Sequence, residues 1–172
     1  AMGGLRPVVA IYSTFINRAW DQIVYDVALH RLPVVFCLDR AGVTGPDGAS
    51  HHGVYDMALL SKVPGMRVLA PSSAQELSQM LHDAMSLADS GPVAIRYARG
   101  SARQVGEGDV GSGISARRVV AADDPSSSVC VIAIGKMLET AEQAAEMING
   151  SGAAEVTVWD ARCCAPLDAE MI

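Results

Sequence analysis

The segment Pro33–Gly53, "PVVFCLDRAGVTGPDGASHHG", decides how this sequence folds, because it joins an apolar run to a long polar loop. Val34–Leu38 has no polar alternation, which is typical of a strand buried on both faces in a parallel sheet. Asp39–Gly53 has too many glycine and proline residues for a helix or a strand. It also carries two aspartates, an arginine and two adjacent histidines. Loops of this length usually have a function, and glycines let the backbone approach a ligand closely. We therefore expect this loop to bind a ligand; a polar turn that only caps backbone groups is the alternative.

Apolar runs of the same kind recur on both sides of this segment, and helical patterns separate them. Val8–Tyr12 predicts a buried parallel strand, and Ser13 or Thr14 can cap a helix whose apolar positions run from Ile16 to Ala28 and which Pro33 ends. The elements expected after the loop are a short helix at Tyr55–Val63, a strand at Arg67–Ala70, a helix from the Ser73-x-x-Glu76 capping box to about Ala88, and a strand at Val93–Tyr97. This alternation predicts an α/β fold with a mainly parallel sheet and helices on both faces.

The composition changes near residue 100, where glycine, serine and scattered charges replace the apolar runs. We therefore expect a first unit at 1–100, a linker at 101–114 and the start of a second α/β unit at 115–172. The second unit offers one strand–helix–strand repeat, at Val129–Ile134, Met137–Ile148 and Val156–Trp159. One repeat is small for a complete domain. Both ends look cut from a longer polypeptide, so the chain is expected to be a fragment.

The composition also argues against some classes of partner. The formal net charge is −6 and no cluster of Lys and Arg is present, which argues against nucleic acid. No apolar stretch approaches the roughly 18 residues of a membrane span. The four cysteines, Cys37, Cys130, Cys163 and Cys164, show no CxxC spacing. They are expected to pack as small hydrophobic residues in a reducing, cytoplasmic compartment.

Ionisable and aromatic side chains follow the predicted strands, at the carboxyl ends where parallel sheets bind ligands. Arg40 can clamp a phosphate or carboxylate, and His51 or His52 can exchange protons near neutral pH. Adjacent histidines cannot easily bind one ion, so no metal site is predicted. Arg96 lies within an apolar strand and needs an anionic partner, either a structural aspartate or a ligand. The candidate site residues are Tyr12, Phe15 and Arg18 after the first strand, Arg40, Asp47, His51 and His52 after the second, and Arg96 or Arg99 at the end of the fourth.

The residues after the first strand also have a structural interpretation. Tyr12 and Phe15 either stack a flat heteroaromatic ring or lie in the core. Arg18 either reaches a ligand or forms a surface ion pair with Asp21 or Asp26. Spacing alone leaves both alternatives open.

Longer stretches of the sequence match a known family. The segments "YSTFINRAWDQ" at 12–22, "DRAGVTGPDGASHHG" at 39–53 and "GPVAIRYARG" at 91–100 closely resemble the pyrimidine-binding domain of the 1-deoxy-D-xylulose-5-phosphate synthase family. The tail, with "VCVIAIGKMLETAEQAAEMI" at 129–148, resembles the opening of that family's C-terminal transketolase domain. The resemblance covers nearly the whole chain. It implies a thiamine-diphosphate-binding fold of the pyrimidine type, followed by the start of a second domain.

The resemblance implies a transferase that depends on thiamine diphosphate and Mg²⁺. The family condenses pyruvate with D-glyceraldehyde 3-phosphate to 1-deoxy-D-xylulose 5-phosphate and CO₂, and the product is a precursor of isoprenoids, thiamine and pyridoxal. By position, the resemblance implies three roles. Tyr12, Phe15 and Arg18 line the aminopyrimidine pocket, Arg40 and Arg99 hold the substrate phosphate, and Asp47 and His51 lie beside the reacting carbon, with His51 as the proton-transfer residue.

Some features depart from that family. His52 stands where the family usually has Gln or Asn and receives no role, and Ala98 replaces a proline before Arg99. The resemblance places the family's catalytic glutamate and its Mg²⁺-binding diphosphate domain upstream of residue 1. The chain alone is therefore expected to be inactive and to need that part, within a homodimer. A β-subunit-type 2-oxo acid dehydrogenase component and a non-catalytic α/β assembly module are the alternatives.

Overall fold

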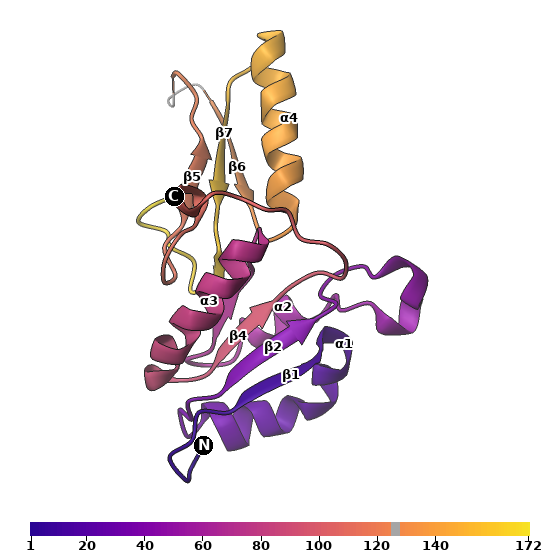
Figure 1. Ribbon diagram of the computed structural model, residues 1–172, viewed down its shortest axis with the longest axis vertical. Helices are drawn as coiled ribbons and strands as arrows, with labels where there is room; N and C mark the ends of the chain where they lie inside the picture. The colour runs from indigo at the N-terminus through magenta and orange to yellow at the C-terminus, as the bar shows by residue number, and fades with distance from the viewer. Residues whose placement is uncertain (125–127) are drawn as a thin grey trace.

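A computed structural model describes residues 1–124 and 128–172, and in this part of the chain two β-sheets meet end to end (Figure 1). The first sheet has the strand order β1-β2-β4-β3-β8, and the second has the order β5-β7-β6. The strands of the first sheet are β1 (Val8–Tyr12), β2 (Val35–Asp39), β3 (Arg67–Leu69), β4 (Val93–Arg96) and β8 (Cys163–Ala165). Those of the second are β5 (Arg117–Val120), β6 (Val129–Ala133) and β7 (Val156–Asp160).

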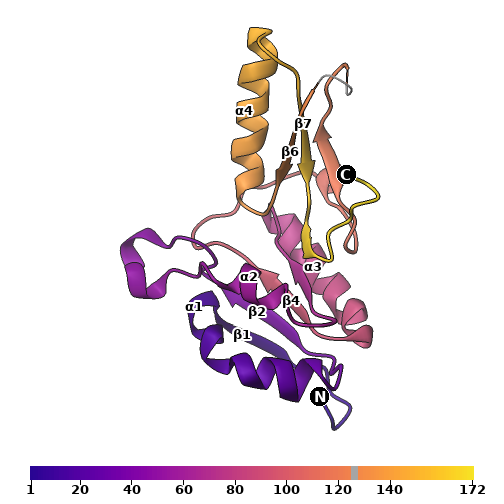
Figure 2. The ribbon, with the colours of Figure 1, turned by 180° about the vertical axis from the view of Figure 1, so that it is seen from behind.

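The first sheet is mainly parallel and has helices on both faces, which confirms the predicted fold class. Strands β1, β2, β4 and β3 run parallel to one another. The helical segment 13–28 and α2 (Asp56–Leu60) pack on one face, and α3 (Ala74–Leu87) packs on the other (Figures 1 and 2). Alternate residues of β2 therefore enter different cores: Phe36 and Leu38 lie on the side of segment 13–28, and Val35 and Cys37 lie on the side of α3. Burial on both faces explains the unbroken apolar run. Burying each large side chain stabilises the fold by about 1.5–3 kcal/mol.

Strand β1 lies at the edge of its sheet, so the prediction that it is buried was wrong. Within the described residues its one strand partner is β2. Val8 is 49% exposed and Val9 is 36% exposed. An apolar run indicates a strand, but its place in the order of the sheet depends on pairings that the run does not encode.

The predicted helix at 13–28 exists, but its hydrogen-bonding pattern changes along its length. It consists of α1 (Ser13–Ile16), the 3₁₀ turn η1 (Asn17–Ala19) and the π-helical segment η2 (Gln22–Ala28). The prediction that Ser13 or Thr14 caps it was wrong, because the N-cap is Tyr12 and no side chain caps the helix. The Ser13 side chain is buried, and the Thr14 hydroxyl donates to the carbonyl oxygen of His51 at 2.6 Å. These hydroxyls therefore face the Asp39–Gly53 loop instead of the helix end.

Helix α3 begins as its capping signal predicted. The Ser73 Oγ accepts a hydrogen bond from the backbone N–H of Glu76 at 3.0 Å, and the 3₁₀ turn η5 (Ala88–Ser90) follows the helix. Glu76 is fully buried, and its carboxylate binds Arg162 instead of returning to the cap. The local motif therefore fixes the start of the helix, and a distant residue takes the glutamate.

The second sheet contains the predicted strand–helix–strand repeat. β6 and β7 are parallel and α4 (Met137–Ser151) connects them. This helix is longer than predicted and ends at Gly152, whose φ of +69° favours glycine. Two antiparallel strands were not predicted: β5 pairs with β7, and β8 returns the chain to β3 in the first sheet. Cys130 is exposed, so the expectation that it packs in a core was wrong, whereas Cys37 and Cys163 are buried.

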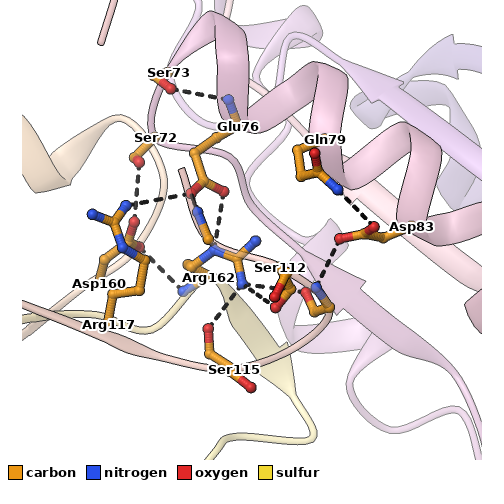
Figure 3. Close-up of polar contacts among 12 residues, drawn as sticks. Ser72, Ser73, Glu76, Gln79, Asp83, Ser112, Ser115, Arg117, Asp160 and Arg162 are labelled. Carbon is orange, nitrogen blue, oxygen red and sulfur yellow. Dashed lines mark hydrogen bonds and ion pairs between the residues drawn. The ribbon is translucent and has the colours of Figure 1, made fainter. Parts of the chain in front are cut away.

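A buried ionic cluster joins the two sheets (Figure 3). Arg162, in the turn between β7 and β8, is fully buried, and its Nε donates to the two carboxylate oxygens of Glu76 at 3.0 and 3.2 Å. Its NH1 donates to the carbonyl oxygens of Ser112 at 2.9 Å and Ser115 at 2.8 Å. Buried Asp160 accepts the hydroxyl of Ser72 at 3.0 Å.

The segment predicted to be a linker is held along α3. It has one 3₁₀ turn, η6 (Glu107–Asp109). The backbone N–H of Gly111 donates to Glu76 at 2.6 Å, and that of Gly113 donates to Asp83 at 2.7 Å. The segment therefore runs along the first unit as an ordered connection before it enters β5.

Candidate functional site

The Asp39–Gly53 loop extends from the carboxyl end of β2 and projects from the body of the molecule (Figure 2). Its ends are closed by two backbone hydrogen bonds between Gly42 and Gly53, at 2.7 and 2.9 Å. The N–H of Ala41 donates to the carbonyl oxygen of Tyr97 at 2.9 Å, which fixes the loop to the end of β4. Two 3₁₀ turns, η3 (Gly45–Asp47) and η4 (Ala49–His51), shape the projecting part. The loop is thus a closed structure with a defined position over the strand ends.

The aromatic candidates lie together beside this loop. The rings of Tyr12 and Phe15 are stacked, with centroids 5.6 Å apart and an interplanar angle of 11°. The ring of His51 meets Phe15 edge-on at 5.6 Å and 76°. The Arg18 Cζ lies 5.8 Å from the Phe15 centroid. Tyr12 and Phe15 are partly exposed, so the alternative that places them in the core was wrong.

The structural alternative for Arg18, a surface ion pair with Asp21 or Asp26, was also wrong. Its side chain is exposed, and in the part of the chain that the structure describes it forms no ion pair with Asp21 or Asp26. It approaches the Phe15 ring instead, as a cation–π contact.

The charged candidates form a chain of contacts around Asp47. Its Oδ2 accepts from the Nε of Arg40 at 3.0 Å and lies 3.3 Å from the Nε of Arg99. Arg40 also pairs with Asp39, and its Cζ lies 4.0 Å from the ring centroid of Tyr12. Tyr12 therefore joins the aromatic half to the charged half. The structure brings seven predicted residues into one connected set, which we call the site cluster: Tyr12, Phe15, Arg18, Arg40, Asp47, His51 and Arg99.

Arg40, which lies at the centre of the site cluster, has an unusual backbone conformation. Its φ is +58°, in the left-handed region that non-glycine residues rarely adopt. Desolvation lowers the pKa of its guanidinium, but the hydrogen bond to Asp47 and the charges of Asp39 and Tyr12 raise the pKa above its ordinary value. The acidic neighbours of Arg40 therefore stabilise its cationic form.

His52 and Arg96 have structural roles. The Nδ1 of His52 accepts from the backbone N–H of Thr44 at 3.1 Å, so the ring holds the loop. Arg96 donates to Asp56 at 2.8 Å, and Asp56 is only 1% exposed. Arg96 therefore has the structural aspartate that was one of its two predicted partners.

Sequence reasoning did not place Asp39 or Thr14 in the site. The Asp39 carboxylate accepts from the backbone N–H of Arg40 and also forms an ion pair with the Arg40 guanidinium. Thr14 holds the backbone of His51. A signal for Asp39 was present, since an acid directly precedes the arginine, but nothing local predicted that Thr14 reaches residue 51.

Two negative findings concern residues 1–124 and 128–172. No group of three or more His, Cys, Asp and Glu side chains there is arranged to hold a metal ion. No helix in that part of the chain is both long and apolar enough to cross a bilayer.

The Gly53→Ala substitution is expected to destabilise the fold by about 2–3 kcal/mol through overpacking. A Cβ at Gly53 would lie 2.6 Å from the carbonyl oxygen of Arg40 and 2.5 Å from the Cβ of Ser13, and a backbone atom cannot easily move away. Gly108→Ala is the matched control, because a Cβ there meets nothing within 4 Å. Urea unfolding of both variants measures the difference, and equal stabilities would show that the loop can move away from Ser13.

Comparison with known proteins agrees with this geometry. The family description "Transketolase, pyrimidine binding domain" matches residues 1–104, and "Transketolase, C-terminal domain" matches residues 119–172. The 1-deoxy-D-xylulose-5-phosphate synthase of Anaeromyxobacter dehalogenans (strain 2CP-1 / ATCC BAA-258) is 49% identical over 181 residues, covering 100% of this chain and 27% of the relative. The synthase of Mycolicibacterium vanbaalenii is 47% identical over 179 residues, covering 99% of this chain and 26% of the relative. These relatives confirm the resemblance drawn from the motifs, and the chain spans about a quarter of their length.

Solved structures show the same fold. One described as "Split gene transketolase, inactive beta4 tetramer" superposes with a TM-score of 0.83 at 26% identity, covering 98% of this chain and 53% of that chain. A Pichia stipitis transketolase superposes with a TM-score of 0.80 at 17% identity, covering 92% of this chain and 23% of that chain. The pyrimidine-binding description alone spans more than half of the sequence. The chain therefore belongs to the transketolase family, with a pyrimidine-binding domain followed by a segment of the C-terminal domain.

Proposed function

We propose that this chain is the pyrimidine-binding and early C-terminal portion of a 1-deoxy-D-xylulose-5-phosphate synthase. The whole enzyme would condense pyruvate with D-glyceraldehyde 3-phosphate and release CO₂. The observation that carries the proposal is the site cluster: seven residues chosen from motifs on three strand ends touch one another in a single connected set. Relatives that carry the synthase name match the chain over its full length, which favours this enzyme over the β-subunit-type dehydrogenase component.

The aromatic half of the site cluster fits the aminopyrimidine of thiamine diphosphate. Tyr12 and Phe15 form a flat, partly exposed aromatic surface on which a planar ring can stack. Bound there, the cofactor would supply an electron sink for pyruvate decarboxylation. Phe15 would hold the ring in position, and Arg18 would keep its charge at the border of the aromatic surface.

The charged half fits a phosphate group. Arg40 and Arg99 both converge on the Oδ2 of Asp47, so their guanidinium groups lie close enough to grip one small anion together. Asp47 would hold the two arginines in register until the substrate phosphate binds. Arg40 would need no change of protonation, because its pKa is raised.

His51 is the proposed proton-transfer residue. Its ring touches Phe15, its Nδ1 lies 3.1 Å from the hydroxyl of Ser50, and its backbone is held by Thr14. These contacts fix the imidazole against the aromatic half of the site cluster. An imidazole there can give a proton to, or take one from, the oxygen of a carbonyl substrate.

The rest of the enzyme is part of the proposal. All site-cluster side chains are at least partly exposed, which is consistent with a site completed by further protein. The diphosphate and Mg²⁺ would be held by that further protein, within a homodimer. A cytoplasmic location is also proposed, because all four cysteines are free thiols. The remainder would lie on the same polypeptide or, as in the neighbour whose name describes a split gene, on a second chain.

The test is a chimera in which residues 1–172 replace the matching segment of the full-length Anaeromyxobacter synthase. With thiamine diphosphate, Mg²⁺ and both substrates, the chimera should form 1-deoxy-D-xylulose 5-phosphate, whereas the 172-residue chain alone should form none. In the chimera, His51→Ala should lower kcat/KM by about 10²- to 10⁴-fold. His82→Ala, an exposed histidine on α3, is the control and should leave kcat/KM unchanged.

Substrate selectivity provides a second readout. Arg99→Gln should raise KM for glyceraldehyde 3-phosphate by about tenfold or more and leave KM for pyruvate unchanged, because only the former carries a phosphate. A folded chimera that forms no product, or one in which His51→Ala is fully active, would contradict the proposal. Turnover by the isolated chain would contradict its dependence on further protein.

A further inference from the structure

A small cavity lies between the two units, beside the site cluster. It has a volume of about 110 Å³ and is lined by residues 97–103 after β4, by the start of α3, and by the first turn of α4. β4, β3 and β6 each end close to it, because the segments that follow these strands form its walls. In Figures 1 and 2 the carboxyl ends of β4 and β6 approach each other at this boundary. Ligands of open α/β sheets bind outside such strand ends.

The charged residues that line this cavity are mainly cationic: Arg99, Arg103, Lys136 and Glu139. Two of the cations are already engaged. Arg99 pairs with Asp47, and Arg103 pairs with Glu142 and donates to the carbonyl oxygen of Ser72. Lys136 forms no ion pair within residues 1–124 and 128–172. Among the three cations that line the cavity, Lys136 is therefore the one without an acidic partner in the described residues, and a bound anion could neutralise it.

The walls of the cavity can strengthen an interaction with Lys136. Leu77 and Ala98 line it together with buried Ser73. The Ser73 oxygen accepts from the N–H of Glu76, so its own proton remains available for donation. Lys136 itself is exposed, so the apolar walls strengthen its interaction only on the side where they exclude water. The volume also exceeds the roughly 30 Å³ share of one water molecule several-fold.

We propose that this cavity binds a small anion of the phosphate class, with Lys136 as its principal cation and the Ser73 hydroxyl as a donor. Arg99 and Arg103 border the anion and add to the positive potential, and Glu139 opposes it. The inference goes beyond the proposed function, because Arg99 is the one member of the site cluster that lines this cavity. The occupant would be a free phosphate or a phosphorylated metabolite held next to the site cluster.

The test uses inorganic phosphate and the 172-residue chain. Titration calorimetry should give saturable binding at millimolar phosphate. Backbone amide shifts in NMR spectra should move at residues 98–103 and 136–138. Binding should weaken as NaCl is added, since chloride screens and competes for the same charge.

Four variants locate the site. Lys136→Gln should weaken phosphate binding by about tenfold or more, and Glu139→Gln should tighten it several-fold by removing the opposing charge. Lys62→Gln is the matched control, because Lys62 is the other lysine of the chain, is exposed and lies outside this cavity. Arg40→Gln changes the proposed substrate-phosphate site and should leave the phosphate-induced amide shifts at residues 136–138 in place, because Arg40 does not line this cavity.

The outcomes divide cleanly. The proposal is supported if Lys136→Gln weakens phosphate binding and Glu139→Gln tightens it. Both variants must have the circular dichroism of the original chain. No saturable binding by the original chain would overturn it. Binding that is lost with Arg40→Gln but kept with Lys136→Gln would also overturn it, and would place the phosphate at the site cluster.

Discussion

Replacing Arg162 by methionine is expected to lower the free energy of unfolding by about 3–5 kcal/mol, because it leaves the buried carboxylate of Glu76 without its main partner. Arg162 and Glu76 are both fully buried and are joined by two hydrogen bonds. The same guanidinium holds the carbonyl oxygens of Ser112 and Ser115. The connection between the units should loosen along with α3. Urea unfolding followed by circular dichroism measures the change.

Arg31→Met is a matched control for this substitution. Arg31 has a φ of +51°, close to the +54° of Arg162, so both variants place methionine in the left-handed region. Arg31 is exposed and forms no ion pair in the described part of the chain, so the control should change stability by at most about 0.5 kcal/mol. The double variant Arg162→Met with Glu76→Gln should recover part of the loss, because the buried group is then neutral. Equal stabilities of the two single variants would show that the pair contributes nothing to the fold.

Asp160→Asn should gain about 3 kcal/mol of stability relative to the original chain as the pH rises from about 3.5 to about 7.5. Burial raises the pKa of Asp160 from 3.8 to about 6, and the charge of Glu76 adds to this. The hydrogen bonds from Ser72 and from the N–H of Arg162, together with the Arg162 charge, only partly oppose the shift. Because the native pKa is the higher one, the native state binds more protons than the unfolded state between about pH 4 and pH 6. The original chain therefore loses stability as pH rises through this window, by about 1.4 kcal/mol for each unit of pKa difference.

The measurement is the difference in unfolding free energy between Asp160→Asn and the original chain at about pH 3.5 and about pH 7.5. Asparagine keeps the oxygen that accepts from the N–H of Arg162, so the difference should change by about 3 kcal/mol in favour of asparagine as pH rises. Asp123→Asn, at an exposed position, should show almost no change with pH. A difference for Asp160→Asn that does not vary with pH would mean that Asp160 stays ionised in the fold.

Much of the first unit could be predicted because its signals are local. The apolar run before Asp39, the capping residue Ser73 and the change of composition near residue 100 each act over a few residues. The predicted strands at Arg67–Ala70 and Val93–Tyr97 agree with β3 and β4 to within a residue. Strand β8 escaped prediction because Cys163–Ala165 contains no β-branched or aromatic residue and ends before Pro166.

The candidate site was predicted in its members but not in its contacts. Tyr12, Arg40 and Arg99 follow different strands, and parallel topology alone suggests that such residues share an edge of the sheet. The position of the Arg40 guanidinium 4.0 Å from the Tyr12 ring centroid, and the convergence of both arginines on Asp47, depend on how the loop closes between Gly42 and Gly53. Loop closure of this kind is a matter of three-dimensional fit, which local patterns do not report.

By itself the sequence determined the strand–helix alternation, the mainly parallel sheet and the set of polar residues at the strand ends, because each depends on side-chain spacing within one segment. The tertiary structure alone decided that β1 lies at an edge, that Arg96 binds Asp56, and that Glu76 meets a guanidinium 86 residues away. The physical reason is the same in each case. A buried charge or an unpaired strand is stabilised by whichever partner the fold brings near, and partners far apart in the sequence are chosen by the packing of the whole chain.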